Sequence, residues 1–318
     1  MIWLIGANGM LGTEASRQLS EKKIDFVSSD NDVDITDFSA LESFAKKNQD
    51  SGKKLSFIVN CAAYTAVDNA EEDEEKARKI NAEGPMNIAR LAKNIGAVLI
   101  HISTDYVFDG NGIKGEDGNV RPYTEDAPVA PIGAYGRTKA EGEKLLSSET
   151  DSFYILRTAW LYGWAGKNFV YTMIRAMNTH ESVKVVSDQR GTPTFCGTLA
   201  GVILRIIEAD SQGNKIPYGT YHVTDEGETT WFDFTKEIQK QAAGLKIAPN
   251  VGNCTVNPCS TKDYPTKATR PAYSVLSKKK IQNALGIKLP EWQESLGVFL
   301  GSVMFDGERI NFNSTYNN

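Results

Sequence analysis

The chain has 318 residues, of which 41% are hydrophobic and 24% charged, and its formal net charge is −5. These values are ordinary for a globular protein, and the length favours two lobes over a single core. They exclude the basic surface of a nucleic-acid-binding protein, and no apolar run approaches the roughly 18 residues that a membrane span requires.

The first elements predict a dinucleotide site. Residues 1–5 form an apolar run typical of a buried strand, Gly6-Ala-Asn-Gly-Met-Leu-Gly12 indicates a turn, and residues 13–19 indicate the start of a helix. In this context the backbone N–H groups of the turn and helix can bind a pyrophosphate. The spacing G-x-x-G-x-x-G is a weak signal by itself, and an ordinary glycine turn is the alternative. A second apolar run, 24–27, leads to Asp30, where an acid would bind a ribose hydroxyl or simply cap a turn.

Strands and helices then alternate along the chain. Residues 55–59 and 97–102 have the apolar character of buried strands, and residues 73–94 between them are expected to be helical. Such βαβ units predict an α/β fold with a parallel, doubly wound sheet. Ligands of these sheets bind at the carboxyl ends of the strands, where residues 60–63 and 103–105 would lie.

The remaining elements divide the chain into two parts. A loop over 110–131 is followed by a helix over 134–146 and a strand over 153–157, and beyond that the alternation becomes less regular. Short strands are expected at 183–186 and 219–223 and a helix over 231–243, its start marked by Thr229 and Thr230. We predict a Rossmann-type NAD(P)-binding domain over 1–156. We predict a smaller, mixed α/β substrate lobe over 157–318, with segments at roughly 195–225 returning to the first domain. The polar, Asn-rich tail, 306–318, should have a loose end.

Three side chains indicate carbonyl–alcohol redox chemistry. Tyr135 and Lys139 lie four residues apart in an expected helix and therefore share one face. An ammonium there can lower the pKa of the phenol from about 10, so that the phenol exchanges a proton with a carbonyl or alcohol oxygen near neutral pH. The hydroxyl of Thr104, at the end of a strand, could hold the same oxygen. This chemistry needs a hydride donor, which the glycine turn would bind.

These motifs resemble the extended short-chain dehydrogenases/reductases. Four further segments, within residues 1 to about 200, resemble the dTDP-4-dehydrorhamnose reductase family: Cys61-Ala-Ala-Tyr-Thr-Ala-Val-Asp68, Ser103-Thr-Asp-Tyr-Val-Phe-Asp-Gly110, Arg157-Thr-Ala-Trp-Leu-Tyr-Gly163 and Asp188-Gln-Arg-Gly-Thr-Pro-Thr194. The resemblance implies that NADPH or NADH reduces the 4-keto group of dTDP-4-dehydro-L-rhamnose, the last step of dTDP-L-rhamnose synthesis.

The resemblance also implies residue roles. Tyr135 would be the proton donor, Lys139 its pKa tuner and ribose anchor, and Thr104 the hydroxyl that orients the carbonyl. The cofactor would meet Gly6, Asn8, Gly9, Met10, Leu11, Asp30, Asp34, Ile35, Ala62, Ala63, Tyr64, Tyr135 and Lys139. The substrate would meet Val67, Thr104, Asp105, Tyr106, Tyr135, Trp160 and Asn168.

Simpler structural roles remain open for several of these residues. Trp160 could be a packed aromatic, Asn168 a helix cap, and Asp105 a turn residue that binds nearby N–H groups. Arg190 could contact a phosphate or only line a loop.

The sequence gives little support for a metal. The four cysteines form no C-x-x-C pair and the three histidines are scattered, so we expect no metal site, reduced thiols and a cytoplasmic location. Some members of the family form dimers around a magnesium ion held by glutamates, one of which follows a Gly-x-Pro-Thr motif. Here residues 195–198 read Phe-Cys-Gly-Thr, without an acid, so we expect a monomer or a weak homodimer.

Two other functions remain open. One is reduction of a different nucleotide-linked 4-keto sugar by the same three side chains. The other is a non-catalytic, NADP-binding regulatory role, as in the regulatory subunit of methionine adenosyltransferase, which resembles this family. A turnover assay separates the two classes.

Overall fold

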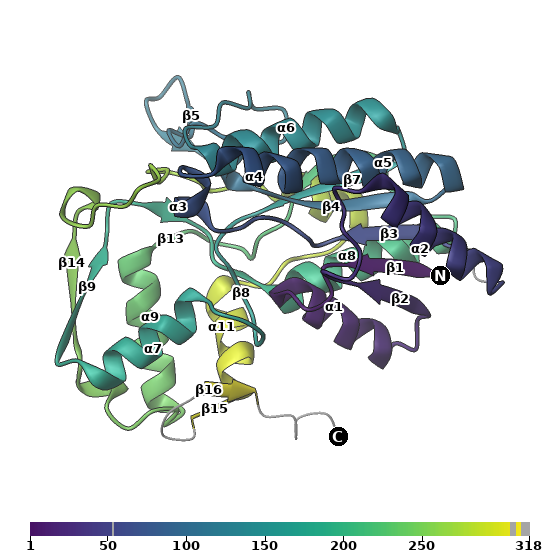
Figure 1. The fold of residues 1–318 in the computed structure, drawn as a ribbon. Helices are drawn as coiled ribbons and strands as arrows, with labels where there is room; N and C mark the ends of the chain where they lie inside the picture. Colours follow the sequence, from purple (N-terminus) through teal and green to yellow (C-terminus); the bar gives the residue numbers. More distant parts are fainter. Residues whose placement is uncertain (53, 306–309, 313–318) are drawn as a thin grey trace.

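The structure is a computed structural model that describes residues 1–52, 54–305 and 310–312 (Figure 1). The loose end expected within the tail, 306–318, lies outside the described residues except for 310–312. Within the part of the chain that is described, none of the helices combines the length and apolar character needed to cross a bilayer.

A six-stranded parallel sheet forms the centre of the first lobe. Its strands are β1 (Ile2–Ile5), β2 (Phe26–Ser29), β3 (Phe57–Asn60), β4 (Val98–Thr104), β7 (Phe153–Thr158) and β12 (Gly219–His222), in the order β12-β7-β4-β3-β1-β2. The chain winds outward from β1 to β2, then returns past β1 to β3 and continues the other way. The predicted doubly wound sheet is thus confirmed, and its topological switch point lies between β1 and β3.

Helices cover both faces of this sheet (Figure 1). On one face lie α1 (Met10–Glu21), α8 (Cys196–Ser211) and α10 (Lys279–Leu285), and on the other α2 (Phe38–Asp50), α5 (Gly84–Ile95) and α6 (Ala134–Glu149). Strand β1 is apolar throughout because its side chains enter the cores on both faces of the sheet. Ile2 and Leu4 enter the core under α1 and α8, whereas Trp3 and Ile5 enter the core under α2 and α5.

The helix expected over 73–94 is interrupted. It consists of α4 (Glu74–Arg78), a π-helical turn (Lys79–Glu83) and α5. Pro85 lies at the start of α5 and has no backbone N–H, so the carbonyl of Asn81 cannot find its usual partner four residues later. A π-turn is one way in which a helix accommodates such a loss.

The second lobe has its own core around α7 (Phe169–Thr179), α9 (Trp231–Gly244) and α11 (Trp292–Gly301). The expected strand at 183–186 is β9 (Ser182–Val186), which pairs in parallel with β14 (Thr255–Cys259). Thr230 caps α9 by accepting the N–H of Asp233, as its sequence indicated.

The shorter elements are α3 (Val67–Ala70), β5 (Ile113–Lys114), β6 (Val120–Arg121), β8 (Leu161–Tyr162), β10 (Arg190–Gly191), β11 (Thr194–Phe195), β13 (Thr229–Thr230), β15 (Val303–Phe305) and β16 (Ile310–Phe312).

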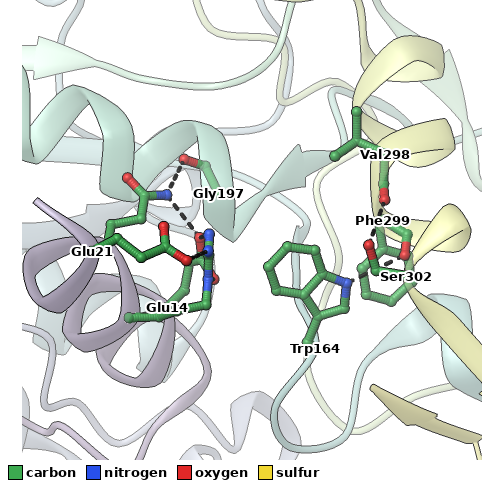
Figure 2. Close-up of polar contacts among 9 residues, drawn as sticks. Glu14, Glu21, Trp164, Gly197, Val298, Phe299 and Ser302 are labelled. Atoms are coloured by element: carbon green, nitrogen blue, oxygen red, sulfur yellow. Dashed lines mark hydrogen bonds and ion pairs between the residues drawn. The ribbon is translucent and has the colours of Figure 1, made fainter. Parts of the chain in front are cut away.

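Trp164 connects α1 and α11 at the boundary between the lobes. Figure 2 shows Trp164 beside Phe299, whose carbonyl accepts the indole N–H at 3.2 Å. The guanidinium of Arg17 in α1 lies 5.2 Å from the centre of the Trp164 ring. Gln18 donates to the carbonyl of Gly197 at the start of α8 at 3.0 Å. These contacts hold α1 and α8 in place.

Strand β12 pairs with β7 although β12 follows the first part of the second lobe in the sequence. The domain boundary predicted at residue 156 stays a prediction.

Candidate active site

A cavity of about 1040 Å³ lies at the carboxyl ends of β1, β3, β4 and β7. Most of the residues predicted for the site line it: Gly6, Asn8, Gly9, Met10, Leu11, Asp30, Asp34, Ile35, Ala62, Ala63, Val67, Thr104, Asp105, Tyr106, Tyr135, Lys139 and Trp160. Cys61 and Ser103, which the sequence analysis placed at strand ends where ligands bind, also line it. The sequence analysis missed the other lining residues, which are Asn31, Val33, Thr65, Ile80, Ile102, Thr158, Ala159 and Leu161. The cavity contains the switch point, where doubly wound sheets bind their ligands.

The glycine turn forms the floor of one end of the cavity. Gly6 has a φ of +76°, and a Cβ there would lie 2.7 Å from the backbone nitrogen of Ala62. A Cβ on Gly12 would lie 2.1 Å from the carbonyl oxygen of Gly6. Only glycines therefore allow the turn to fold this tightly against β3. Helix α1 begins at Met10 without a side-chain cap, which leaves its first N–H groups free for an anion.

Asp30 has a structural role as well as a place in the cavity wall. One carboxylate oxygen accepts the N–H of Asn8 at 2.9 Å and the other accepts the N–H of Asn31 at 2.9 Å. Asp30 therefore braces the glycine turn, as one alternative held, while it also lines the cavity.

Close packing of α6 against β4 and the turn after it brings three predicted catalytic side chains together. A Cβ on Gly136 would lie 2.1 Å from the carbonyl oxygen of Tyr106, so the glycine lets the helix touch this backbone. Thr104 ends β4 and donates a hydrogen bond to Asp105 at 2.9 Å. Lys139 is 1% exposed, and its Nζ donates to the carbonyl of Ile102 at 2.8 Å.

Burial dominates the proton affinities of the site. It raises the pKa of Tyr135 above its usual value, and a hydrogen bond with Thr104 only partly opposes it. Lys139 was expected to lower the pKa of Tyr135. In this structure the pKa is raised instead, because desolvation disfavours the charged phenolate. Burial also lowers the pKa of Lys139 to about 8, against the opposing charge of Glu143. The phenol is thus protonated at neutral pH and can act as a proton donor.

Asp105 contributes a buried carboxyl group to the cavity wall. Burial raises its pKa to about 6, and the neighbouring hydroxyls of Ser274 and Thr104 oppose that rise. By hydrogen-bond geometry, its Oδ2 has no partner among the described residues. Buried polar atoms usually have a hydrogen-bond partner, which the Ser274 hydroxyl, a ligand or a water could supply here.

Trp160 both packs and lines the cavity. Its ring stacks on Trp231 with the ring centroids 3.5 Å apart and an interplanar angle of 10°. Its φ is +46°, a strained value for a bulky residue. The surrounding structure therefore holds Trp160 in a backbone conformation that a bulky residue does not favour by itself.

Two predicted residues and Arg190 lie elsewhere. Asn168 caps α7: its Oδ1 accepts the N–H of Tyr171 at 3.0 Å and its Nδ2 donates to the carbonyl of Gly163 at 2.7 Å. Tyr64 is held beside the cavity wall by its backbone and does not line the cavity. The exposed Arg190 pairs with Glu228 at 2.7 Å. Among the described residues, no group of three or more His, Cys, Asp and Glu side chains could hold a metal ion.

Asn81 was not predicted as a site residue. It lies in the π-turn, is buried, and donates to the hydroxyl of Thr138 at 3.2 Å, one residue before Lys139. Its position just before Gly84 and Pro85, in an otherwise helical pattern, was the signal that could have indicated a special backbone here.

The parallel sheet, the glycine turn and the Thr104, Tyr135 and Lys139 arrangement are those of an extended short-chain dehydrogenase/reductase. The family model for the RmlD substrate binding domain matches residues 1–304. The dTDP-4-dehydrorhamnose reductase of Aggregatibacter actinomycetemcomitans is 38% identical over 303 residues, which cover 92% of this chain and 96% of that protein. The chain belongs to the dTDP-4-dehydrorhamnose reductase family and is an oxidoreductase.

Solved structures agree with this assignment. A dTDP-4-dehydrorhamnose reductase from Clostridium acetobutylicum is 42% identical and superposes with a TM-score of 0.83, covering 94% of this chain and 98% of that one. The Bacillus anthracis dTDP-4-dehydrorhamnose reductase, solved in complex with NADP, is 35% identical with a TM-score of 0.81, covering 94% and 97% of the two chains.

Proposed function

We propose that this chain catalyses the NAD(P)H-dependent reduction of the 4-keto group of dTDP-4-dehydro-L-rhamnose, which gives dTDP-L-rhamnose. The observation that carries the proposal is the meeting of Thr104, Tyr135 and Lys139 in one cavity with the glycine turn, in a chain of this family.

The residues present fit a dinucleotide. The turn at Gly6 and Gly12 has no room for a Cβ, and the uncapped start of α1 offers N–H groups to a pyrophosphate. Asp34 and Ile35 would line the adenosine end, and Ala62 and the backbone near Tyr64 the wall beside it. NADPH or NADH, when bound, supplies the hydride.

The protein's own task is to move and hold a proton. Tyr135 keeps its proton at neutral pH because its phenol is buried, and it would give that proton to the oxygen that forms at C4. Thr104 points its hydroxyl proton at Asp105 in this structure, so it can accept a hydrogen bond from the phenol or rotate to donate one to the substrate. Lys139 would bind the ribose. It would also balance the negative charge that Tyr135 acquires when the phenol gives up its proton.

The residues proposed to bind the substrate are Asp105, Tyr106, Val67 and Trp160. The carboxyl of Asp105 would bind a sugar hydroxyl, and the Trp160 face would offer an apolar surface for a deoxy-sugar. Asn168 would act indirectly, by capping α7. These residue roles are proposals drawn from position and chemistry.

A relative favours a second candidate substrate. A probable dTDP-4,6-dihydroxy-2-methyloxan-3-one 4-ketoreductase of Streptomyces antibioticus is 38% identical over 303 residues and covers 93% of both chains. The same three side chains would serve another nucleotide-linked 4-keto sugar. NAD(P)H oxidation by the purified protein with a panel of nucleotide-linked 4-keto sugars tests both candidates. No turnover with any of them, in a protein that binds cofactor, would favour a regulatory role.

We also propose a monomer or weak homodimer in the cytoplasm. Residues 195–198 provide no carboxylate for a metal-linked dimer, and all four cysteines are unpaired, as in a reducing compartment. Light scattering with magnesium and with a chelator tests the first point. A dimer that dissociates in the chelator would contradict it.

A further inference from the structure

The imidazole of His101 is fully buried beside Lys139. It projects from β4 and is 0% exposed. Its Nε2 lies 3.2 Å from Nζ of Lys139, and its Nδ1 lies 3.1 Å from Nδ2 of Asn60. Both ring nitrogens therefore contact another nitrogen, so each contact needs one donor and one acceptor.

The backbone of the cavity wall fixes the orientation of the Asn60 amide. Oδ1 of Asn60 accepts the N–H of Ala62 at 3.0 Å, so Nδ2 faces His101. An amide nitrogen only donates, and Nδ1 of His101 therefore accepts. A neutral imidazole carries one proton, which must then lie on Nε2 and point at Lys139.

Lys139 can accept this proton only as an amine. An ammonium has three donors and no acceptor, whereas an amine can donate to Ile102 and accept from His101. Burial acts in the same direction, because it lowers the pKa of Lys139 to about 8. Burial also holds the pKa of His101 well below its usual value, and an ammonium on Lys139 would lower it further, so the ring stays neutral in either state of Lys139.

We propose that His101 is a positioning residue that sets how many protons Lys139 carries, through a hydrogen-bond chain running from Ala62 through Asn60 and His101 to Lys139. When Lys139 is an amine, every contact in the chain has one donor and one acceptor. When it gains a proton, Nε2 must accept, the ring proton moves to Nδ1, and Asn60 must turn its oxygen toward the ring. Ala62 then loses its acceptor.

The chain therefore couples the proton on Lys139 to the cavity wall at Ala62. This consequence rests on the proposed function, in which Lys139 acts beside Tyr135 and Ala62 lies next to the cofactor. The proton count itself follows from the contacts alone.

Other charged groups around α6 already have partners. Glu143 of α6 favours the ammonium of Lys139, but Arg157 of β7 pairs with it at 2.6 Å. Asp105, after β4, acts mainly on Tyr135 and Tyr106. Asp68 of α3 pairs with Arg270, Glu74 of α4 pairs with Arg137, and Glu71 between these helices accepts the Ala134 N–H. Glu72 pairs with Lys267, and Glu75 pairs with Lys79. Arg78 pairs with Glu83 of the π-turn and Glu141 of α6, and Arg90 of α5 pairs with Glu149. His101 is thus the polar side chain in direct contact with Lys139 whose own proton can change position when Lys139 gains or loses a proton.

Nitrogen-15 NMR of the imidazoles in the cofactor-free, full-length protein measures the proton position without turnover. The chain has three histidines, and His101→Phe identifies the His101 signals by their loss. At pH 9 we expect a neutral ring with its proton on Nε2. As the Lys139 ε-carbon signal reports protonation at lower pH, the ring proton should move to Nδ1. A proton on Nδ1 at pH 9, or a Lys139 titration that leaves the tautomer unchanged, would overturn the proposal.

Asn60→Asp tests the chain with a nearly isosteric change. A carboxylate accepts from both Ala62 and Nδ1 of His101, which leaves Nε2 to accept from an ammonium. We expect the pKa of Lys139 to rise by about one unit, a tenfold gain in proton affinity. In the His101→Phe background the same substitution should produce a clearly smaller rise. Equal rises in both backgrounds would mean that the added charge alone is responsible, and the proposal would fail.

His222→Phe provides the matched control. His222 is an equally buried histidine on β12, with its Nδ1 3.2 Å from the carbonyl oxygen of Tyr123. The His222→Phe variant should leave the pKa of Lys139 unchanged. A shift of that pKa would mean that the loss of any buried imidazole explains the effect of His101→Phe. In the turnover assay, Asn60→Asp should move the basic limb of kcat/KM upward in pH. Absence of turnover in the wild type would count against the proposed function, whereas the NMR result would still decide the role of His101.

Discussion

The side chain of Asn81 binds both backbone groups of Tyr64. Its Oδ1 accepts the Tyr64 N–H at 2.8 Å, and its Nδ2 donates to the Tyr64 carbonyl at 3.1 Å. The amide thus replaces a missing strand partner for the segment that follows β3, and it holds the cavity wall at Ala62 and Ala63 against the π-turn.

Asn81→Leu should therefore destabilise the protein and weaken cofactor binding together. Each partly buried Tyr64 group left unpaired costs up to about 1–3 kcal/mol. Urea unfolding and fluorescence titration with NADPH measure the two effects. Asn178→Leu is the control, because Asn178 accepts the N–H of Asn250 at 3.0 Å in the second lobe and its loss should spare cofactor affinity. Unchanged cofactor affinity in Asn81→Leu would show that Asn81 does not shape the cofactor wall.

Tyr135→Phe should lose turnover but keep cofactor binding. The substitution removes only the hydroxyl, and general acid catalysis contributes about 10²- to 10⁴-fold. Steady-state kinetics and thermal unfolding are compared with those of Tyr171→Phe, which removes a hydroxyl that donates to the Trp164 carbonyl outside the cavity. If Tyr135→Phe keeps more than half of the wild-type kcat, Tyr135 is not the proton donor.

Trp160→Ala should impair substrate handling while it leaves cofactor affinity nearly intact. Loss of an apolar pocket contact costs about 1–3 kcal/mol in kcat/KM. If Trp160 serves only as core, the cost should appear as roughly 3–5 kcal/mol of stability instead. Trp231→Leu removes the stacked partner without removing a cavity residue, so its kinetic effect should be smaller. Normal kinetics with a large fall in Tm for Trp160→Ala would refute the binding role.

Asp225→Asn should make stability less dependent on pH. Burial raises the pKa of Asp225 to about 7, and hydrogen bonds from Thr198 and the Phe195 N–H oppose the rise. Between pH about 4 and 7 the folded carboxyl keeps a proton that the unfolded one has released, so wild-type stability falls as pH rises through this window. The fall is roughly 2–4 kcal/mol, at about 1.4 kcal/mol per pKa unit.

The asparagine variant should lack this component of the fall. Free energies of unfolding in urea at pH 5 and pH 8 measure the difference, and Asp151→Asn, which alters an exposed carboxylate, should follow the wild type. Parallel pH dependences for Asp225→Asn and the wild type would contradict the buried-charge explanation.

Much of the first lobe could be predicted because its signals are local. The apolar run at 2–5 fills both faces of the sheet, and its turn contains glycines that the packing requires. Tyr135 and Lys139 share a helix face, which spacing alone indicates. The direction of the Tyr135 pKa shift could not be predicted, because it depends on burial, which spacing does not reveal.

The second lobe gave weaker signals. β8 and β11 have two residues each and pair with each other across the 31 intervening positions 163–193, so no periodicity marks them. α8, which packs on the sheet of the first lobe, was also not predicted, because its residues are buried on most sides and show little amphipathic pattern. For Asn168, a cap and a ligand have the same residue type and the same place in sequence, and only three-dimensional position separates them.

The return of α8, β12 and α10 to the sheet ties the lobes together by several chain crossings. A cut after residue 156 would remove the strand that covers one edge of the sheet and a helix that buries one of its faces. Exchanging the substrate lobe for that of a relative would therefore require several joined segments rather than a single fusion point. The crossings also resist rotation about any one linker, so closure over a substrate should occur by small sliding of packed helices.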